Sequence, residues 1–172
     1  KCKGMTKITN FLKTSWVARA VFLAILCGIV YIHFLQNSFI WDDDYYLTKN
    51  PHLKNVDGLK RIWFDILATP QYYPLVFTSF WVEHKFWALD PLGYHVDNVI
   101  IHCINAVLLW RILSFLEVKG SWLAATIFLI HPIQAESVAW ISERKNLLSG
   151  FFSFLSLYFF FQPNPVKFYE NG

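Results

Sequence analysis

Apolar residues fall into separate blocks along this chain, and the first block is long enough to cross a membrane. Residues 20–40 contain no Asp, Glu, Lys or Arg. As a helix rising about 1.5 Å per residue, this run covers roughly 30 Å, the thickness of a hydrocarbon core. It is longer than the apolar region of a secretory signal peptide and continues into Phe39, Ile40 and Trp41. The pattern therefore predicts an uncleaved membrane span over 17–38.

A second span is predicted over 96–116, although this block carries several polar residues. His95, Asn98, His102 and Asn105 are spaced i, i+3, i+7 and i+10, so they share one face of a helix. Polar groups within a membrane are costly and normally face a bundle interior or a wet cavity. Two interpretations remain open: interhelical hydrogen bonds, or the wall of a functional cavity.

Two further apolar blocks predict spans over 120–137 and 146–162, giving about four in all. The residues 117–120 leave room only for a tight turn between the second and third spans. Five basic residues precede the first apolar core and place the N-terminus in the cytoplasm; they are Lys1, Lys3, Lys7, Lys13 and Arg19. A chain that crosses the membrane four times from a cytoplasmic N-terminus brings the loop 41–93 and the segment 132–145 to the same, non-cytoplasmic side.

The predicted outer loop contains its own helices. Residues 59–67 mix apolar and charged positions and indicate a short helix. Residues 75–89 carry Phe77, Phe80, Trp81, Phe86 and Trp87. This pattern is typical of an aromatic helix at a membrane interface, where amphipathic rings prefer to lie.

Composition supports an all-α membrane protein. Hydrophobic residues make up 55% of the 172 residues and charged residues 16%, against about 25% charged in a soluble domain. These values argue against disorder, nucleic-acid binding and a solvated enzyme, and a net charge of +3 is too small to indicate a polyanionic partner. Ten of the twelve acidic residues fall in the two outer segments or at their helix mouths.

One candidate for chemistry follows the first span directly. Asp42, Asp43 and Asp44 are consecutive, and carboxylates this close raise one another's pKa unless a positive charge lies near. They could form a solvated loop that ends the helix. They could instead supply a general base, or ligands for a divalent metal, at the membrane surface.

A second candidate lies around the third and fourth spans. His131, Pro132 and Glu136 end the third block, where proline breaks the helix. Arg144 and Lys145 open the fourth, either as anchors that snorkel to the interface or as a clamp for phosphate oxygens. Carboxylates and two cations at one membrane face would suit a substrate with a lipid tail and a phosphate head.

These residues resemble a known family. The stretches WDDDYYLTKNP, YYPLVFTSFWVEHKFWALDPLGYHVDNVIIHCINAVLLW and GSWLAATIFLIHPIQAESVAWISERKNLLSG are similar to the transmembrane and tetratricopeptide-repeat O-mannosyltransferase family. That family belongs to the GT-C glycosyltransferases, which use polyprenyl-phosphate sugars. The resemblance implies a multi-span helical bundle with juxtamembrane helices in the first outer loop.

The resemblance also implies site residues. The family's acidic pair matches Asp42 and Asp43, and its HP-x-x-x-E stretch matches His131, Pro132 and Glu136. Its arginine, usually within Gly-Arg-x-Asp-Leu-Leu, matches Arg144, but Asn146 replaces the aspartate here. We expect Asp42 or Asp43 to act as the base and Arg144 with Lys145 to bind the donor phosphate; the predicted supporting residues are His131, Glu136, His95 and His102.

The function implied is transfer of a mannose-like sugar from a polyprenyl-phosphate donor to a hydroxyl of a protein or glycan, with inversion. A multi-pass protein of the bacterial inner membrane or the endoplasmic reticulum membrane is expected, with no nucleic-acid partner. Because relatives carry more spans and a repeat array, residues 1–172 are expected to be the amino-terminal module of the membrane domain. The alternative is a non-catalytic membrane scaffold or assembly subunit with the same fold.

Overall fold

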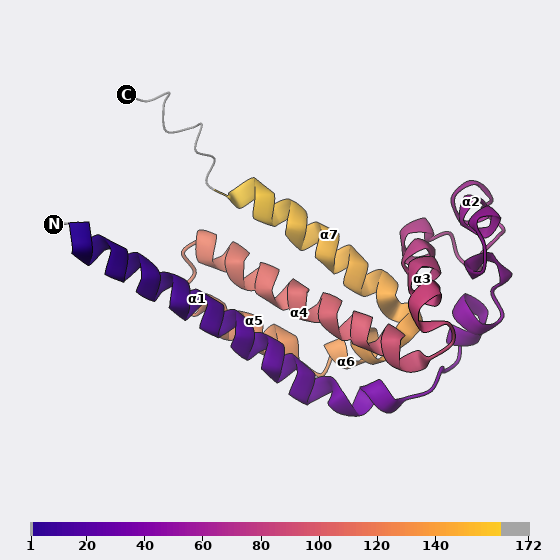
Figure 1. The fold of residues 1–172 in the computed structure, drawn as a ribbon, viewed down its shortest axis with the longest axis horizontal. Coiled ribbons are helices and arrows are strands. Elements are labelled where there is room, and N and C mark those ends of the chain that lie inside the picture. Colours follow the sequence, from indigo (N-terminus) through magenta and orange to yellow (C-terminus); the bar gives the residue numbers. More distant parts are fainter. Residues whose placement is uncertain (1, 163–172) are drawn as a thin grey trace, which may run out of the picture.

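The structure, a computed structural model, describes residues 2–162, with side chains from residue 16 onward (Figure 1). Within that range every regular element is helical. The α-helices are α1 (Cys2–Tyr31), α2 (Val56–Phe64), α3 (Pro74–Trp87), α4 (Pro91–Phe115), α5 (Ser121–Ile130), α6 (Gln134–Ala139) and α7 (Arg144–Phe161). The all-helical prediction is therefore confirmed for the described residues.

The long helices lie along one axis, and three of the short ones, α2, α3 and α6, lie at one end (Figure 1). In Figure 1, α1, α4 and α7 run side by side, with α4 in the middle, while α2, α3 and α6 lie at the end where α1 finishes and α4 begins. Helix α4 contacts α1, α5 and α7. We call this the α2–α3 end; it contains the loop 41–93 and the segment 132–145 that the sequence predicted to lie together.

Two helices have the length and apolar character needed to cross a membrane, Trp16–Gln36 and Pro91–Phe115. The first continues α1 through a 3-10 turn, Ile32–Gln36 (η1). Most residues of both apolar windows lie on the surface of the fold, as expected for helices that face lipid. Both fit a membrane protein and match the first two predicted spans.

The third predicted span, 120–137, is broken. Helix α5 ends at Ile130, before Pro132, and α6 begins at Gln134. With ten residues, α5 covers only about half of a hydrocarbon core. The predicted four spans are thus not confirmed. Four of the five basic side chains behind the predicted orientation, Lys1, Lys3, Lys7 and Lys13, lie outside the described side chains.

The polar face of α4 makes interhelical hydrogen bonds, as one of the two interpretations predicted. The Asn98 amide donates to the backbone carbonyls of Val138 and Trp140, at 3.2 and 3.3 Å. His102 Nε2 lies 3.0 Å from the carbonyl oxygen of Leu129. These carbonyls lie at the ends of α5 and α6, where no further turn of the same helix can satisfy them. Helix α4 therefore compensates for the break in its neighbour.

Asn105, on the same face, donates to the carbonyl of Leu147 in α7 at 2.9 Å. Asn105 and His102 also line a cavity of about 200 Å³ between α4, α5, α6 and α7. The two interpretations of this face are therefore compatible, because its side chains both join helices and border an internal space.

The α2–α3 end has an apolar core of its own, in which Tyr46, Leu53, Phe77 and Phe80 are buried together. Helix α2 is capped by Asn55, whose side chain accepts a hydrogen bond from the Gly58 N–H at 2.7 Å. The predicted outer helices 59–67 and 75–89 correspond to α2 and α3, shifted by one to three residues at each end. This core fixes α3 across the ends of α4 and α7.

Candidate functional site

The three consecutive aspartates have three different environments, and Asp43 is the buried one. Its carboxylate accepts hydrogen bonds from the Ile40 N–H at 3.0 Å and, 99 residues later, from the Ser142 N–H at 2.9 Å. Burial raises the pKa of Asp43, and these two N–H donors partly oppose that shift. Asp43 therefore joins the turn after α1 to the segment before α7, as the predicted topology required.

Asp42 and Asp44 are not enclosed in this way. Asp42 is exposed, whereas Asp44 accepts a hydrogen bond from Lys49 Nζ at 3.0 Å, which lowers the pKa of that carboxyl. Both oxygens of Asp43 are committed to backbone amides. Asp42 is consequently the member of the predicted pair that an incoming hydroxyl can reach.

The hydroxyl of Tyr46 marks where several site groups converge. It donates to Gln71 Oε1 at 2.9 Å. Burial is the main cause that raises its pKa to about 12, followed by the charges of Tyr73, Asp42 and Glu143. The charges of Asp42 and of Tyr73 thus both act on the Tyr46 hydroxyl, and Tyr73 lines the cavity described below.

Arg144 is fully buried, at 0% exposure, and its guanidinium is held by protein groups on all sides. Its Nε donates to Asn98 Oδ1 at 2.7 Å and its Nη2 to the Tyr94 carbonyl at 2.8 Å. Its Nη1 pairs with Glu83, and its plane lies over the Phe80 ring at 4.7 Å. The expectation that Arg144 binds the donor phosphate stays a prediction, and in this structure its donors are used by groups inside the protein.

Glu83 is a site residue that sequence reasoning missed. It lies on α3 and pairs with Arg144 on α7, while its own side chain is 12% exposed. Burial raises the pKa of Glu83, and the Arg144 guanidinium opposes that shift. A signal was present: Glu83 is the single acidic residue between 66 and 89, and a carboxylate in so apolar a helix needs a partner.

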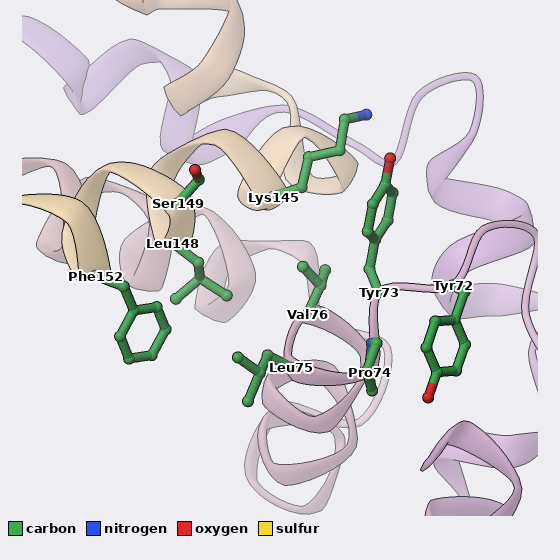
Figure 2. A pocket seen from close by; sticks show the side chains of 9 residues that line it. All are labelled: Tyr72, Tyr73, Pro74, Leu75, Val76, Lys145, Leu148, Ser149 and Phe152. Atoms are coloured by element: carbon green, nitrogen blue, oxygen red, sulfur yellow. The ribbon is translucent and has the colours of Figure 1, made fainter. Parts of the chain in front are cut away.

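Lys145 has a different environment from its neighbour. It lies at the rim of a cavity of about 330 Å³ between α3 and α7, and its side chain is 28% exposed. Figure 2 shows Leu75, Leu148 and Phe152 facing this cavity, with Lys145 and the Tyr73 hydroxyl toward one end. Lys145 Nζ donates to Glu143 Oε1 at 2.6 Å. The result is an apolar cavity with a cation at its edge.

The predicted supporting residues are divided between surface and interior. His131 and Glu136 are exposed, whereas His95 and His102 are buried. His95 Nε2 lies 3.2 Å from the Asn37 carbonyl oxygen, so it helps hold the chain that follows η1. In the described part of the chain, no group of three or more His, Cys, Asp or Glu side chains is placed to hold a metal ion.

The fold fits a helical membrane protein, because two of its helices are apolar and long enough to span a bilayer. The exposed Asp42 carboxylate and the lysine at the edge of an apolar cavity form its candidate site. Comparisons with known proteins name its relatives. The chain is 27% identical over 161 residues to protein O-mannosyl-transferase F38B6.6 of Caenorhabditis elegans, covering 84% of this chain and 23% of that protein.

It is 29% identical over 143 residues to protein O-mannosyl-transferase TMTC3 of Homo sapiens (76% of this chain, 16% of that protein). It is 31% identical over 140 residues to tmtc2 of Xenopus laevis (75% and 17%). The chain is thus a homologue of the TMTC family of protein O-mannosyl-transferases, which confirms the resemblance. It spans about one fifth of the length of these relatives. No family model matches the chain, and no solved structure matches it.

Proposed function

We propose that this chain forms part of the catalytic membrane domain of a GT-C-type glycosyltransferase. In this proposal a mannose-like sugar passes from a polyprenyl-phosphate donor to a hydroxyl on a protein. The α2–α3 end faces the non-cytoplasmic side of the membrane. The names of the relatives support sugar transfer to protein. The single observation that carries the donor class is the apolar cavity with Lys145 at its rim.

The cavity suits one end of a lipid phosphate. Its lining offers Leu75, Val76, Leu148 and Phe152 to a hydrocarbon chain, and burying such a chain is favourable by roughly 0.8 kcal/mol per CH₂. A phosphate at the rim would meet the Lys145 ammonium, which at present pairs with Glu143. Lysine binds phosphate as a point charge. A donor phosphate would therefore compete with Glu143 for Lys145.

The reaction proposed is a single displacement. The Asp42 carboxylate takes the proton of the acceptor hydroxyl while that oxygen attacks the anomeric carbon. The bond between this carbon and the phosphate oxygen breaks, and the electron pair stays on the phosphate, where Lys145 balances the added charge. Attack opposite the leaving group inverts the anomeric configuration. Arg144 has a positioning role, because it fixes α3 and α7 as the two walls of the cavity.

The test is sugar transfer by the full-length protein reconstituted in membranes, using a labelled polyprenyl-phosphate mannose and a peptide rich in Ser and Thr. Asp42→Asn removes the proton acceptor with almost no change in shape, so transfer should fall by about 100-fold or more. The matched control is Asp44→Asn, because Asp44 is a neighbouring carboxylate engaged by Lys49. Equal transfer by the wild type and Asp42→Asn would remove Asp42 from the mechanism. No transfer by the wild type would favour a scaffold.

A further inference from the structure

A second cleft, of about 520 Å³, borders the aspartate turn, and the proposed mechanism does not use it. One wall is the chain that follows η1, including Asn37 and Trp41. The other is α6 and the residue after it, including Glu136, Ala139 and Trp140. Trp41 immediately precedes Asp42, so a molecule bound in this cleft lies next to the proposed base.

Trp41 is held in a strained conformation at the mouth of the cleft. Its φ is +46°, in the left-handed region that side chains with a Cβ rarely adopt. The strain is sustained because Asp43 bonds the N–H groups of both Ile40 and Ser142, which fixes the chain on either side. The Trp41 indole is 78% exposed. It meets Trp140 edge-on, with ring centroids 5.2 Å apart. Backbone strain that keeps a large aromatic ring in solvent is typical of a ligand clamp.

The chemistry of the cleft differs from that of the cavity at Lys145. Here the charged group on the wall is a carboxylate, Glu136, and Asp42 follows the other wall. Two carboxylates repel an anionic head group, so a lipid phosphate belongs at Lys145 and not here. A plain hydrocarbon chain offers no donor or cation to Glu136, so it would make no use of the charge on this wall. A polypeptide can contact both the aromatic and the acidic groups of the cleft. Its apolar side chains can pack on the indoles, and its N–H donors or cationic side chains can bind the carboxylates.

We propose that the Trp41–Trp140 cleft binds the acceptor, as an extended polypeptide segment whose Ser or Thr hydroxyl reaches Asp42. The proposal rests on the proposed function for the identity of the reaction, but binding itself needs no donor. Glu136 then acts as a specificity residue. It favours Lys or Arg beside the acceptor hydroxyl and disfavours Asp or Glu there, since opposite charges attract and like charges raise the cost of binding.

The experiment measures binding of two fluorescent peptides to the membrane-reconstituted protein without donor. One peptide has Lys on both sides of a Ser/Thr pair, and the other has Glu at the same positions. The Lys peptide should bind severalfold more tightly. Trp41→Ala should weaken the binding of either peptide by about tenfold, as expected for an aromatic contact residue. Glu136→Lys should reverse the preference, whereas Glu117→Lys, at the distant turn between α4 and α5, should leave it unchanged.

Equal binding of both peptides by the wild type and Glu136→Lys, with no effect of Trp41→Ala, would overturn the cleft assignment. The proposed function is tested by a separate measurement, sugar transfer from the labelled donor. If the peptides bind as expected but no sugar is transferred from the labelled donor, the cleft stands and the donor chemistry is wrong. If sugar is transferred but neither Trp41→Ala nor Glu136→Lys alters peptide binding, the reaction stands and the acceptor binds elsewhere. Circular dichroism of each variant verifies that its helices are intact.

Discussion

Neutralising Glu83 is expected to loosen the contact between α3 and α7. The Arg144 guanidinium has no solvent around it, and Glu83 supplies its countercharge. In Glu83→Gln the amide oxygen can still accept a hydrogen bond, but the positive charge of Arg144 is no longer balanced. Asn98 Oδ1 and the Tyr94 carbonyl remain as partners, so the network is weakened without being removed.

The size of this effect follows from the burial of the pair. Breaking a buried ion pair by removing one partner costs about 3–5 kcal/mol. Because Glu83 is 12% exposed and glutamine keeps an acceptor, we expect Glu83→Gln to lower the free energy of unfolding by roughly 2–3 kcal/mol. Arg144→Met leaves the Glu83 carboxylate and two polar partners unsatisfied, and should cost about 3–5 kcal/mol. The double variant should lower the free energy of unfolding by about 2 kcal/mol less than the sum of the two single variants.

The assay is a double-mutant cycle, with unfolding followed by circular dichroism as SDS is titrated into mixed micelles. The matched control is the pair of Asp44 and Lys49, which has similar charges but exposed side chains. Asp44→Asn and Lys49→Met should show no coupling, because solvent screens such pairs. A coupling energy below about 0.5 kcal/mol between Glu83 and Arg144, the level at which independent sites simply add, would refute the positioning role of Arg144.

Three further outcomes are expected. Gly93→Ala should destabilise the fold by about 1–3 kcal/mol, since its Cβ would lie 2.3 Å from the Trp87 ring, whereas Gly28→Ala meets nothing within 4 Å and serves as the control for melting temperature. Lys145→Gln should weaken equilibrium binding of polyprenyl phosphate roughly tenfold through loss of one charge-assisted contact, and unchanged binding would assign the lysine to the membrane interface alone. Burial holds the pKa of Asp43 above the ordinary 3.8. The Asp43 side chain therefore contributes its full stability to the fold below pH 3.8, and this contribution is lost as the pH rises through the raised pKa. The melting-temperature advantage of the wild type over Asp43→Asn should therefore shrink as the pH rises above 3.8, and an advantage that grows with pH would contradict the direction of that shift.

The sequence predicted the helices and the polar face of α4 because both depend on local spacing. Residues at i, i+3 and i+7 share a face in any α-helix, and Asn98 and His102 needed only a neighbouring helix to bond. The turn after Glu117 and the break before Pro132 were equally local, since they depend on single residues that cannot continue a helix.

The site was harder to predict because its geometry depends on contacts between distant residues. Arg144 and Lys145 are adjacent, but successive side chains on a helix point about 100° apart. Which of the two faces the cavity is decided by Glu83, 61 residues earlier. The difference between Asp42 and Asp43 likewise depends on the conformation of Trp41 and on the amide of Ser142. Motifs identified the segments that hold these residues but could not say which member of each pair is buried.

The carbonyl groups that α4 satisfies also imply an order of assembly. The ends of α5 and α6 leave backbone oxygens that lipid cannot bond, and Asn98 and His102 supply the missing donors. Without α4, the carbonyls of Val138 and Trp140 would lose their Asn98 donor at a cost of several kcal/mol for each unpaired group, while the Leu129 carbonyl would keep only the Tyr31 hydroxyl. Because α4 precedes them in the chain, its donors are synthesised first. The nascent chain can therefore place the broken segment against a helix that has already been made, and a change that delays the packing of α4 would leave α5 and α6 with fewer hydrogen-bond donors.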